Sequence, residues 1–322
     1  MDLAKVTVVT HCDRNYLAKA YSLIRSLRDN SYTGVIVVIC HDKDSFEKLS
    51  RLNLPQVLTY SIFQVEDEFP QLLAARSNRS LHEYFFCVTP FLIKFVMLRF
   101  DSNLYVYLDS DLFFFSDFTS ALDSNENYVV AITPHRYKSN YKHLEIYGKY
   151  NVGLLSVRPC PDSQNIIDWW AKQCIKSTSI NAANDVYGDQ KYLDEFETLI
   201  RGVKSLDNLG HNVAPWNFTD VVQVDGELKI IANLNISSLV YFHFSGLKRH
   251  RYFSLLGFMP FRQKATKQVK TLIYQPYLKS LRESEYKLGI NRGSEQKKIG
   301  LVNLIHSLRY SDLTFNPRLK KN

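Results

Sequence analysis

Cysteine is scarce in this chain, and long apolar runs are missing. The five cysteines of the 322 residues are scattered, and none forms a Cys-x-x-Cys pair. This pattern argues against a disulfide framework and favours free thiols in a reducing compartment. No run approaches the roughly 18 apolar residues of a membrane-spanning helix, and no cationic segment followed by a long apolar run opens the sequence. We therefore expect a cytoplasmic protein without a secretory signal or a spanning helix.

Apolar residues and unevenly placed charge are what the sequence does contain. Hydrophobic residues make up 45% of the chain, which is enough for a substantial core. The net charge of +8 is concentrated at the end, where residues 248–322 hold 17 basic and four acidic residues, against 23 and 28 in residues 1–247. This asymmetry predicts a catalytic domain over 1–247 and a basic, mainly helical appendage over 248–322 that meets an anionic partner.

Short apolar strands alternate with helical patterns along the first 250 residues. Apolar runs predict strands, and residues at mainly helical spacing predict helices between them. This alternation with short connections predicts an α/β fold with a mostly parallel central sheet flanked by helices. The predicted strands lie at 6–10, 35–40, 104–108, 128–133, 152–157 and 239–244, and the helices lie at 16–28, 90–100, 166–175 and 189–196.

The most informative segment is Asp109-Ser110-Asp111, which separates two apolar runs. Carboxylates two positions apart point to the same side of an extended chain. Two like charges in an apolar setting are costly unless they share a proton, water or a cation, and a hard divalent metal satisfies them best. The alternative is a pair of solvated acids in a turn after a strand.

Five segments together resemble the GT-A nucleotide-sugar glycosyltransferases. The resemblance covers roughly residues 5–250 and is greatest to the retaining family-eight group and related bacterial polysaccharide or lipopolysaccharide glycosyltransferases. It implies a GT-A, Rossmann-like fold and transfer of a sugar from a nucleotide donor, expected to be a UDP-sugar. The segments are Asp13-Arg-Asn-Tyr16, Tyr107-Leu-Asp-Ser-Asp111, Asn151-Val-Gly153, Gly188-Asp-Gln-Lys-Tyr-Leu193 and His243-Phe-Ser-Gly-Leu-Lys248.

The resemblance implies a metal site and its ligands. Asp109, Asp111 and His243 are the expected ligands of a divalent cation that neutralises the diphosphate leaving group. Two carboxylates and an imidazole favour Mn²⁺ over Mg²⁺. The alternative for His243 is a core histidine that closes a strand.

The resemblance also implies a donor site. Asp13 and Asn15 correspond to the nucleotide pocket, although an Asp at that point also caps the helix that follows. Lys248 and Arg249 compete for the role of diphosphate-binding cation, an assignment that the spacing leaves open. The other expected donor-site residues are Thr10, Lys94, Ser110, Asn151, Gly153 and Gly246.

Asp189 and Gln190 carry the expected catalytic roles. A glutamine is a poor nucleophile, so the resemblance implies same-face substitution with retention, in which the amide oxygen of Gln190 stabilises the positive charge of the transition state. Asp189 is the candidate for a covalent route. The alternative for both residues is the start of a helix.

Residues 249–270 combine aromatic, apolar and basic residues, as peripheral membrane segments do. We expect contact with an anionic membrane surface at the inner bacterial membrane, and a glycan or lipid-linked glycan as the acceptor. The alternative is that the apolar residues pack on the body. The tail lacks a nucleic-acid module, so no nucleic-acid partner is expected.

Three other functions remain open at this stage. An inverting GT-A enzyme would use a carboxylate such as Asp189 as its base. A nucleotidyltransferase would need a glycine-rich loop after its first strand, and residues 10–16 contain no glycine. A non-catalytic scaffold would bind the nucleotide sugar at the same site but would not transfer the sugar.

Overall fold

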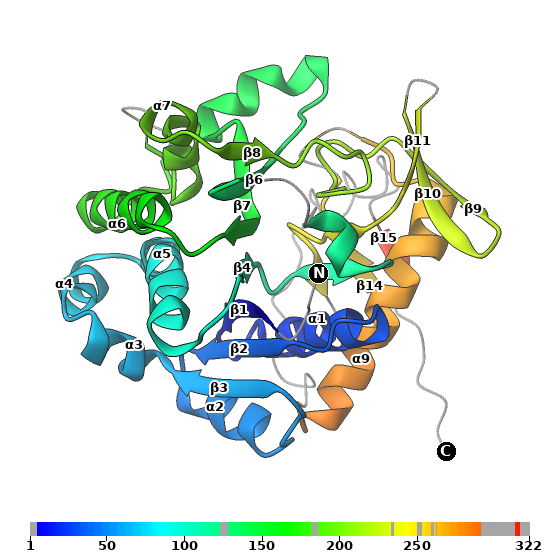
Figure 1. Cartoon of the computed structure of the whole chain (residues 1–322). Coiled ribbons are helices and arrows are strands. Elements are labelled where there is room, and N and C mark those ends of the chain that lie inside the picture. The colour runs from blue at the N-terminus through cyan, green and yellow to red at the C-terminus, as the bar shows by residue number, and fades with distance from the viewer. Residues whose placement is uncertain are drawn as a thin grey trace.

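A seven-stranded sheet forms the centre of the molecule (Figure 1). The computed structural model describes residues 5–122, 128–181, 186–232, 235–249, 253–258, 261, 263–290 and 313–315. The strands follow the order β3-β2-β1-β4-β7-β6-β8, and β7 alone runs against the others, since it pairs antiparallel with β4 and β6. They are β1 (Val6–Cys12), β2 (Val35–Cys40), β3 (Val57–Ser61), β4 (Leu104–Leu108), β6 (Val130–Pro134), β7 (Tyr150–Val157) and β8 (Val203–Ser205).

The strands are continuously apolar because helices cover both faces of the sheet. Val8 and Val9, neighbours in β1, are both buried but belong to different hydrophobic clusters. Val8 lies in the cluster of α1 (Leu17–Asp29), and Val9 lies in that of α5 (Leu81–Arg99) and α6 (Pro161–Lys176). This two-sided burial is typical of mostly parallel sheets, so the predicted fold class is confirmed.

The remaining helices and turns are short. α2 (Lys43–Ser50), α3 (Ile62–Glu68) and α4 (Gln71–Asn78) follow β2 and β3, and α7 (Phe196–Leu199) precedes β8. Helical turns of the 3-10 type are η2 (Phe118–Ala121), η3 (Ser139–Tyr147) and η4 (Gln190–Glu195). The helix predicted over 189–196 is therefore mostly the single short turn η4.

Helix α5 differs most from its prediction over 90–100. It begins at Leu81 because Ser80 forms a capping box with Glu83, and it continues through Pro90. Its length and apolar composition would suit a membrane span, so the expectation that no segment reaches this threshold was wrong. More than half of its apolar window is nevertheless buried inside the protein. Its position between the sheet and α6 is that of a core helix.

A second group of strands lies beside the main sheet. β5 (Leu112–Phe114) pairs with β12 (Tyr241–His243), and β9 (Asp220–Val224), β10 (Glu227–Ala232) and β11 (Asn235–Ser238) form an antiparallel sheet. The strand predicted over 239–244 is thus the shorter β12. Because β5 directly follows the Asp109–Asp111 segment, its pairing brings a late part of the chain to the end of β4.

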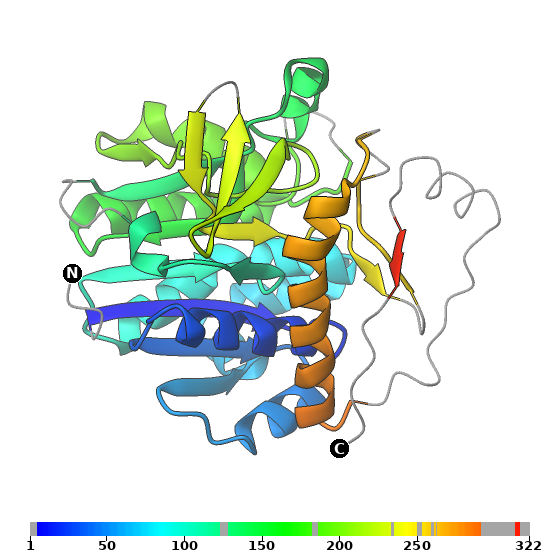
Figure 2. The same ribbon diagram turned by 90° about the vertical axis from the view of Figure 1, so that its right-hand side faces the viewer.

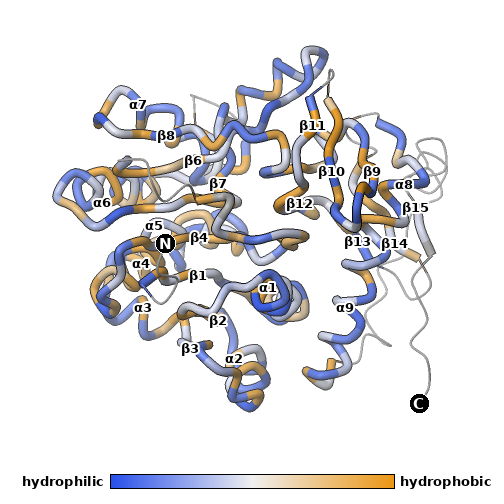
Figure 3. The backbone as a smooth tube through the Cα atoms, turned by 45° about the vertical axis from the view of Figure 1, so that its right-hand side comes forward, coloured by the Kyte–Doolittle hydropathy of each residue, from blue (hydrophilic) through white to orange (hydrophobic). Residues whose placement is uncertain are grey.

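The described part of the basic appendage packs on the body. α8 (Lys267–Val269), the π-helical turn η6 (Lys270–Tyr274) and α9 (Gln275–Lys287) form one rod, and α9 crosses α1 (Figure 2). Ser22 bonds Ser280 at 2.8 Å, and Arg25 pairs with Glu283 at 2.8 Å. Hydrophilic and apolar residues alternate along α9 (Figure 3), which fits one buried face.

Three short strands complete this region. β13 (Lys248–Arg249), β14 (Phe253–Leu255) and β15 (Leu313–Phe315) form a small sheet, so the appendage is not wholly helical. Leu256 and Phe258 are fully buried in a cluster with Tyr274 and Tyr277. Within the described residues, these apolar side chains pack on the body, as in the alternative to a membrane role. The division at residue 247 stays a prediction, and 291–312 and 316–322 lie outside the described residues.

Candidate metal and nucleotide-sugar site

The two aspartates and the late histidine meet at one end of the sheet. β4 ends at Leu108, and the backbone N–H of Asp109 donates to the carbonyl of Gly153 in β7 at 2.9 Å. His243 lies opposite Leu112 in the β5–β12 pair. One ligand atom from each of Asp109, Asp111 and His243 lies within 4.8 Å of the others. The predicted meeting of these three residues, called the triad below, is confirmed.

The charges of the three side chains of the triad interact strongly with one another. Nε2 of His243 lies 3.2 Å from Oδ1 of Asp111 and 3.7 Å from Oδ2 of Asp109. Burial raises the pKa of Asp109, assisted by the charge of Asp111. Burial acts in the same direction on Asp111, but Lys19 and His243 outweigh it and hold that pKa below its ordinary value. Burial would lower the pKa of His243, yet the two carboxylates raise it.

The residues present fit a divalent cation. Two carboxylates and one imidazole supply oxygen and nitrogen ligands close enough to share one ion. Nδ1 of His243 is buried without a partner in the described part of the chain. A Cβ at Gly153 would lie 3.0 Å from that atom and 2.6 Å from Oδ1 of Asn151. Gly153 therefore leaves room for the ring that faces the carboxylates, which gives this predicted position a physical reason.

Asn151 and Gln190 lie beside the triad, since Asn151 and the His243 ring both border Gly153. Nδ2 of Asn151 donates to Oε1 of Gln190 at 3.4 Å and lies 3.3 Å from Nε2 of His135, while Nε2 of Gln190 donates to the carbonyl of Tyr147 at 2.8 Å. Asp189 is almost fully buried, and burial raises its pKa to about 7, with a hydrogen bond from Thr89 acting against the shift. This carboxyl is therefore partly protonated at neutral pH.

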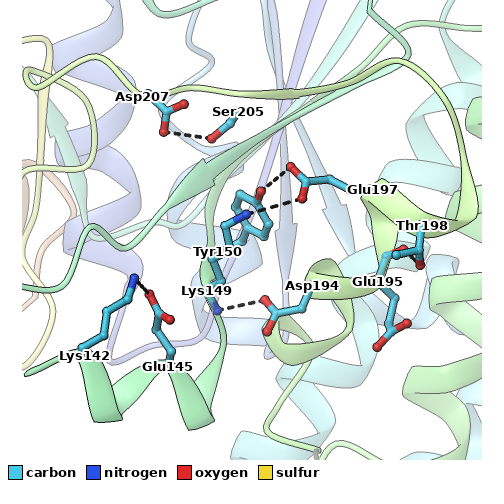
Figure 4. Close-up of polar contacts among 10 residues, drawn as sticks. All are labelled: Lys142, Glu145, Lys149, Tyr150, Asp194, Glu195, Glu197, Thr198, Ser205 and Asp207. Atoms are coloured by element: carbon cyan, nitrogen blue, oxygen red, sulfur yellow. Dashed lines mark hydrogen bonds and ion pairs between the residues drawn. The ribbon is translucent and has the colours of Figure 1, made fainter.

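A polar clamp holds the segment of Gln190 against β7 (Figure 4). The backbone N–H of Lys149 donates to Asp194 at 2.8 Å. The hydroxyl of Tyr150 donates to Glu197 at 2.6 Å, and the Lys149 ammonium reaches the same carboxylate at 3.4 Å. Because Asn151 follows Tyr150 directly, the clamp fixes the spacing between the two amide side chains.

The nucleotide side contains the loop after β1. Oδ1 of Asp13 accepts from the backbone N–H groups of Asn15 and Tyr16, and Oδ2 accepts from the Asn15 amide. Asp13 thus holds the turn before α1, but it is not the cap of that helix, since the N-cap residue is Tyr16 and α1 has no side-chain cap. Oγ1 of Thr10 is buried without a partner within the described residues, and Ser110 is buried between the two aspartates.

Two predicted cations are engaged elsewhere. Lys94 forms an ion pair with Asp168 on α6 at 2.5 Å, in a cavity of about 410 Å³ between helices. The guanidinium of Arg249 forms a double hydrogen bond with Glu285 on α9, and both side chains are nearly buried. Both cations are thus neutralised by carboxylates in this structure, and their assignments to the donor site stay predictions. Lys248 is exposed, and Gly246 turns the chain at a φ of 76°.

Sequence reasoning missed three neighbours of the triad. Tyr107 donates to Oδ1 of Asp109 at 2.8 Å, as its position two residues earlier in the strand could have indicated. The ring of Trp216 lies 5.3 Å from that of His243 and 5.4 Å from that of His135. Lys19 lies 3.4 Å from Asp111. Nothing in the sequence around a lysine in a helix indicates which carboxylate it will contact. The position of α1 relative to the Asp109–Asp111 segment has to be known first.

No model of a known protein family matches the chain. Two uncharacterized proteins of Bacillus subtilis (strain 168) are similar to it. YfnD is 28% identical over 281 residues, which is 85% of this chain and 88% of YfnD. YfnF is 25% identical over 250 residues, which is 74% of this chain and 80% of YfnF.

Solved structures share the fold. The apo structure of the bifunctional glycosyltransferase WbbM superposes with a TM-score of 0.52 at 16% identity, over 90% of this chain and 51% of WbbM. An active-site mutant of LgtC superposes with a TM-score of 0.50 at 14% identity, over 76% of this chain and 90% of LgtC. These likenesses show the GT-A fold.

Proposed function

We propose that the chain is a metal-dependent glycosyltransferase that moves a sugar from a nucleoside diphosphate sugar, expected to be a UDP-sugar, to a glycan or lipid-linked glycan. The observation that carries the proposal is the meeting of Asp109, Asp111 and His243 at one end of a GT-A sheet, with the bonded pair Asn151 and Gln190 beside them. The name of the similar WbbM, a glycosyltransferase, supports the same class of reaction.

A bound metal ion would neutralise the negative charge of the departing diphosphate. Asp109, Asp111 and His243 would hold it, and the imidazole nitrogen favours Mn²⁺. Tyr107 orients Asp109 through its hydroxyl, and the cradle at Gly153 orients the His243 ring. The chain's own contribution is therefore a set of ligands fixed before the donor arrives.

Gln190 is our candidate for the reacting side of the sugar. Its amide oxygen faces Asn151, and its amide nitrogen is held by the carbonyl of Tyr147. A fixed amide oxygen stabilises positive charge at the sugar carbon without forming a covalent bond. Asp189, with a pKa raised to about 7 by burial, is a weaker nucleophile than an ionised carboxylate. Both points favour same-face transfer with retention.

The acceptor would approach over Tyr137, the partly exposed ring of an aromatic group beside the triad. One face of this ring stacks on His135 with centroids 4.7 Å apart, and His135 and Trp216 behind it are buried. An exposed aromatic face of this kind offers apolar contact area to a sugar ring. A membrane contact through 249–270, at the cytoplasmic face of the inner membrane, would depend on exposed charges such as Lys264 and Lys267, because Leu256 and Phe258 are buried.

The test is a screen of nucleotide sugars that follows nucleoside diphosphate release with Mn²⁺, Mg²⁺ or EDTA. We expect metal-dependent release that the Asp109→Ala/Asp111→Ala double variant loses and the control Asp44→Ala/Glu47→Ala, on exposed α2, retains. Full activity of the first double variant contradicts the metal proposal. Release of pyrophosphate in a separate reaction, supplied with a nucleoside triphosphate and a sugar phosphate, would indicate a nucleotidyltransferase. Nucleotide binding without any release in either reaction would indicate a scaffold.

Product stereochemistry tests the role of Gln190 separately. We expect NMR of the product to show a retained anomeric configuration. An inverted product would remove the role of Gln190 and favour Asp189 as a base.

A further inference from the structure

Lys19 is a buried cation that contacts the triad from α1. Its ammonium lies 3.4 Å from Oδ2 of Asp111, and the side chain is 11% exposed. The other side of the ammonium lies 3.8 Å from the centre of the Tyr16 ring. A lysine so placed loses most of its hydration, which the carboxylate and the aromatic face replace.

The two carboxylate oxygens of Asp111 have different partners. Oδ1 faces Nε2 of His243 at 3.2 Å, and Oδ2 faces Lys19. Lys19 therefore neutralises one of the two carboxylate charges of the triad. It also occupies a carboxylate oxygen, Oδ2 of Asp111, that would otherwise attract a metal ion. At short range inside a protein, such a charge acts far more strongly than an exposed one.

We propose that Lys19 is a second, protein-borne cation for the diphosphate, which also limits binding of the metal in the absence of nucleotide. This inference rests on the proposed function. A donor diphosphate held near the triad must meet two carboxylates, and one divalent ion only balances those carboxylates. Lys19 adds the positive charge that the anion requires, and it supports the leaving group, whose negative charge increases as the sugar departs.

The position of Lys19 fits this role better than those of Lys94 and Arg249, two of the cations predicted from the sequence. Arg249 is paired with Glu285, and Lys94 is paired with Asp168. Lys19 lies in the first turn of the helix that follows the turn held by Asp13, so one short segment carries both the nucleotide loop and the cation. A positioning role alone, in which Lys19 only holds Asp111 in place for the metal, predicts the opposite effect on metal affinity.

The experiment measures two ligands that need no sugar transfer. Mn²⁺ alone is titrated by electron paramagnetic resonance. Inorganic pyrophosphate is titrated by calorimetry at saturating Mn²⁺, and the heat of the same titration without protein is subtracted. For Lys19→Met we expect Mn²⁺ to bind about tenfold more tightly, because a competing charge is gone, and pyrophosphate to bind about tenfold more weakly. Lys19→Arg should retain the pyrophosphate affinity, and Lys43→Met, which removes an exposed lysine, should change neither constant.

Lys19→Gln provides the same test if Lys19→Met does not fold, because the amide keeps a hydrogen bond to Asp111 without the charge. Mn²⁺ affinity that is unchanged or weakened in the folded variant overturns the proposal. Failure of the wild-type protein to bind pyrophosphate at saturating Mn²⁺ also overturns it. If the reciprocal shift is found while no nucleotide sugar is turned over, the proposed function fails and the role of Lys19 stands.

Discussion

Replacing Asp189 with asparagine should make the protein more stable at alkaline pH. Asp189 is 4% exposed, and burial raises its pKa from 3.8 to about 7. A carboxyl whose pKa is raised by folding contributes its full stability below pH 3.8, and this contribution is lost as the pH rises through 7. Since each pKa unit corresponds to about 1.4 kcal/mol, the ionised group costs about 4 kcal/mol above pH 8. Asp189→Asn avoids this cost.

The assay is equilibrium urea unfolding at pH 4 and pH 8, with EDTA present so that no metal changes the charge near Asp189. We expect the variant and the wild type to differ little at pH 4. At pH 8 the free energy of unfolding of the variant should be higher by up to about 4 kcal/mol. Asp44→Asn, whose carboxylate is exposed on α2, is the control and should show no such dependence. A difference that is the same at both pH values, or a less stable variant at pH 8, refutes the reasoning.

Three further perturbations test the site and its surroundings. Gly153→Ala should weaken Mn²⁺ binding about tenfold in calorimetry, because its Cβ would lie 3.0 Å from the metal-site histidine ring, while an unchanged affinity would show that the cradle is not needed. Arg249→Ala and Glu285→Ala should each cost about 3–5 kcal/mol in urea unfolding, and the double variant less than their sum; impaired pyrophosphate binding in Arg249→Ala alone would support the assignment of that residue to the donor site. Burial lowers the pKa of His211 to about 4, so its contribution to stability is lost as the pH falls from 6.5 towards 4. His211→Phe, which keeps the stack on Tyr241, should lose less stability over that range, and equal losses would contradict this.

The sheet and the triad could be predicted because their signals are local or ordered along the chain. Apolar runs marked the strands, and two acids at the end of a buried strand marked the metal site. His243 lies 132 positions beyond Asp111, and only its place in an ordered set of segments connected the two. The structure supplies the physical link, which is the pairing of β5 with β12.

The partners of long cationic side chains could not be predicted. Lys19, Lys94 and Arg249 look alike in the sequence, since each is a basic residue near a predicted strand or helix. Their roles are decided by carboxylates on other elements, namely Asp111 and Asp168 for the two lysines. Such pairs depend on how helices pack, which the sequence pattern does not specify.

The crossing of α9 over α1 has a consequence for synthesis. Ser22 and Arg25, on the helix that begins at the nucleotide loop, are met by residues 280 and 283. During translation this face of α1 therefore stays uncovered until nearly 290 residues have been made, long after the aspartates of the triad have emerged. Domains usually fold as their residues emerge. Here the nucleotide loop reaches its supported form only after α9 has been made, so a premature stop before α9 should yield an aggregation-prone product.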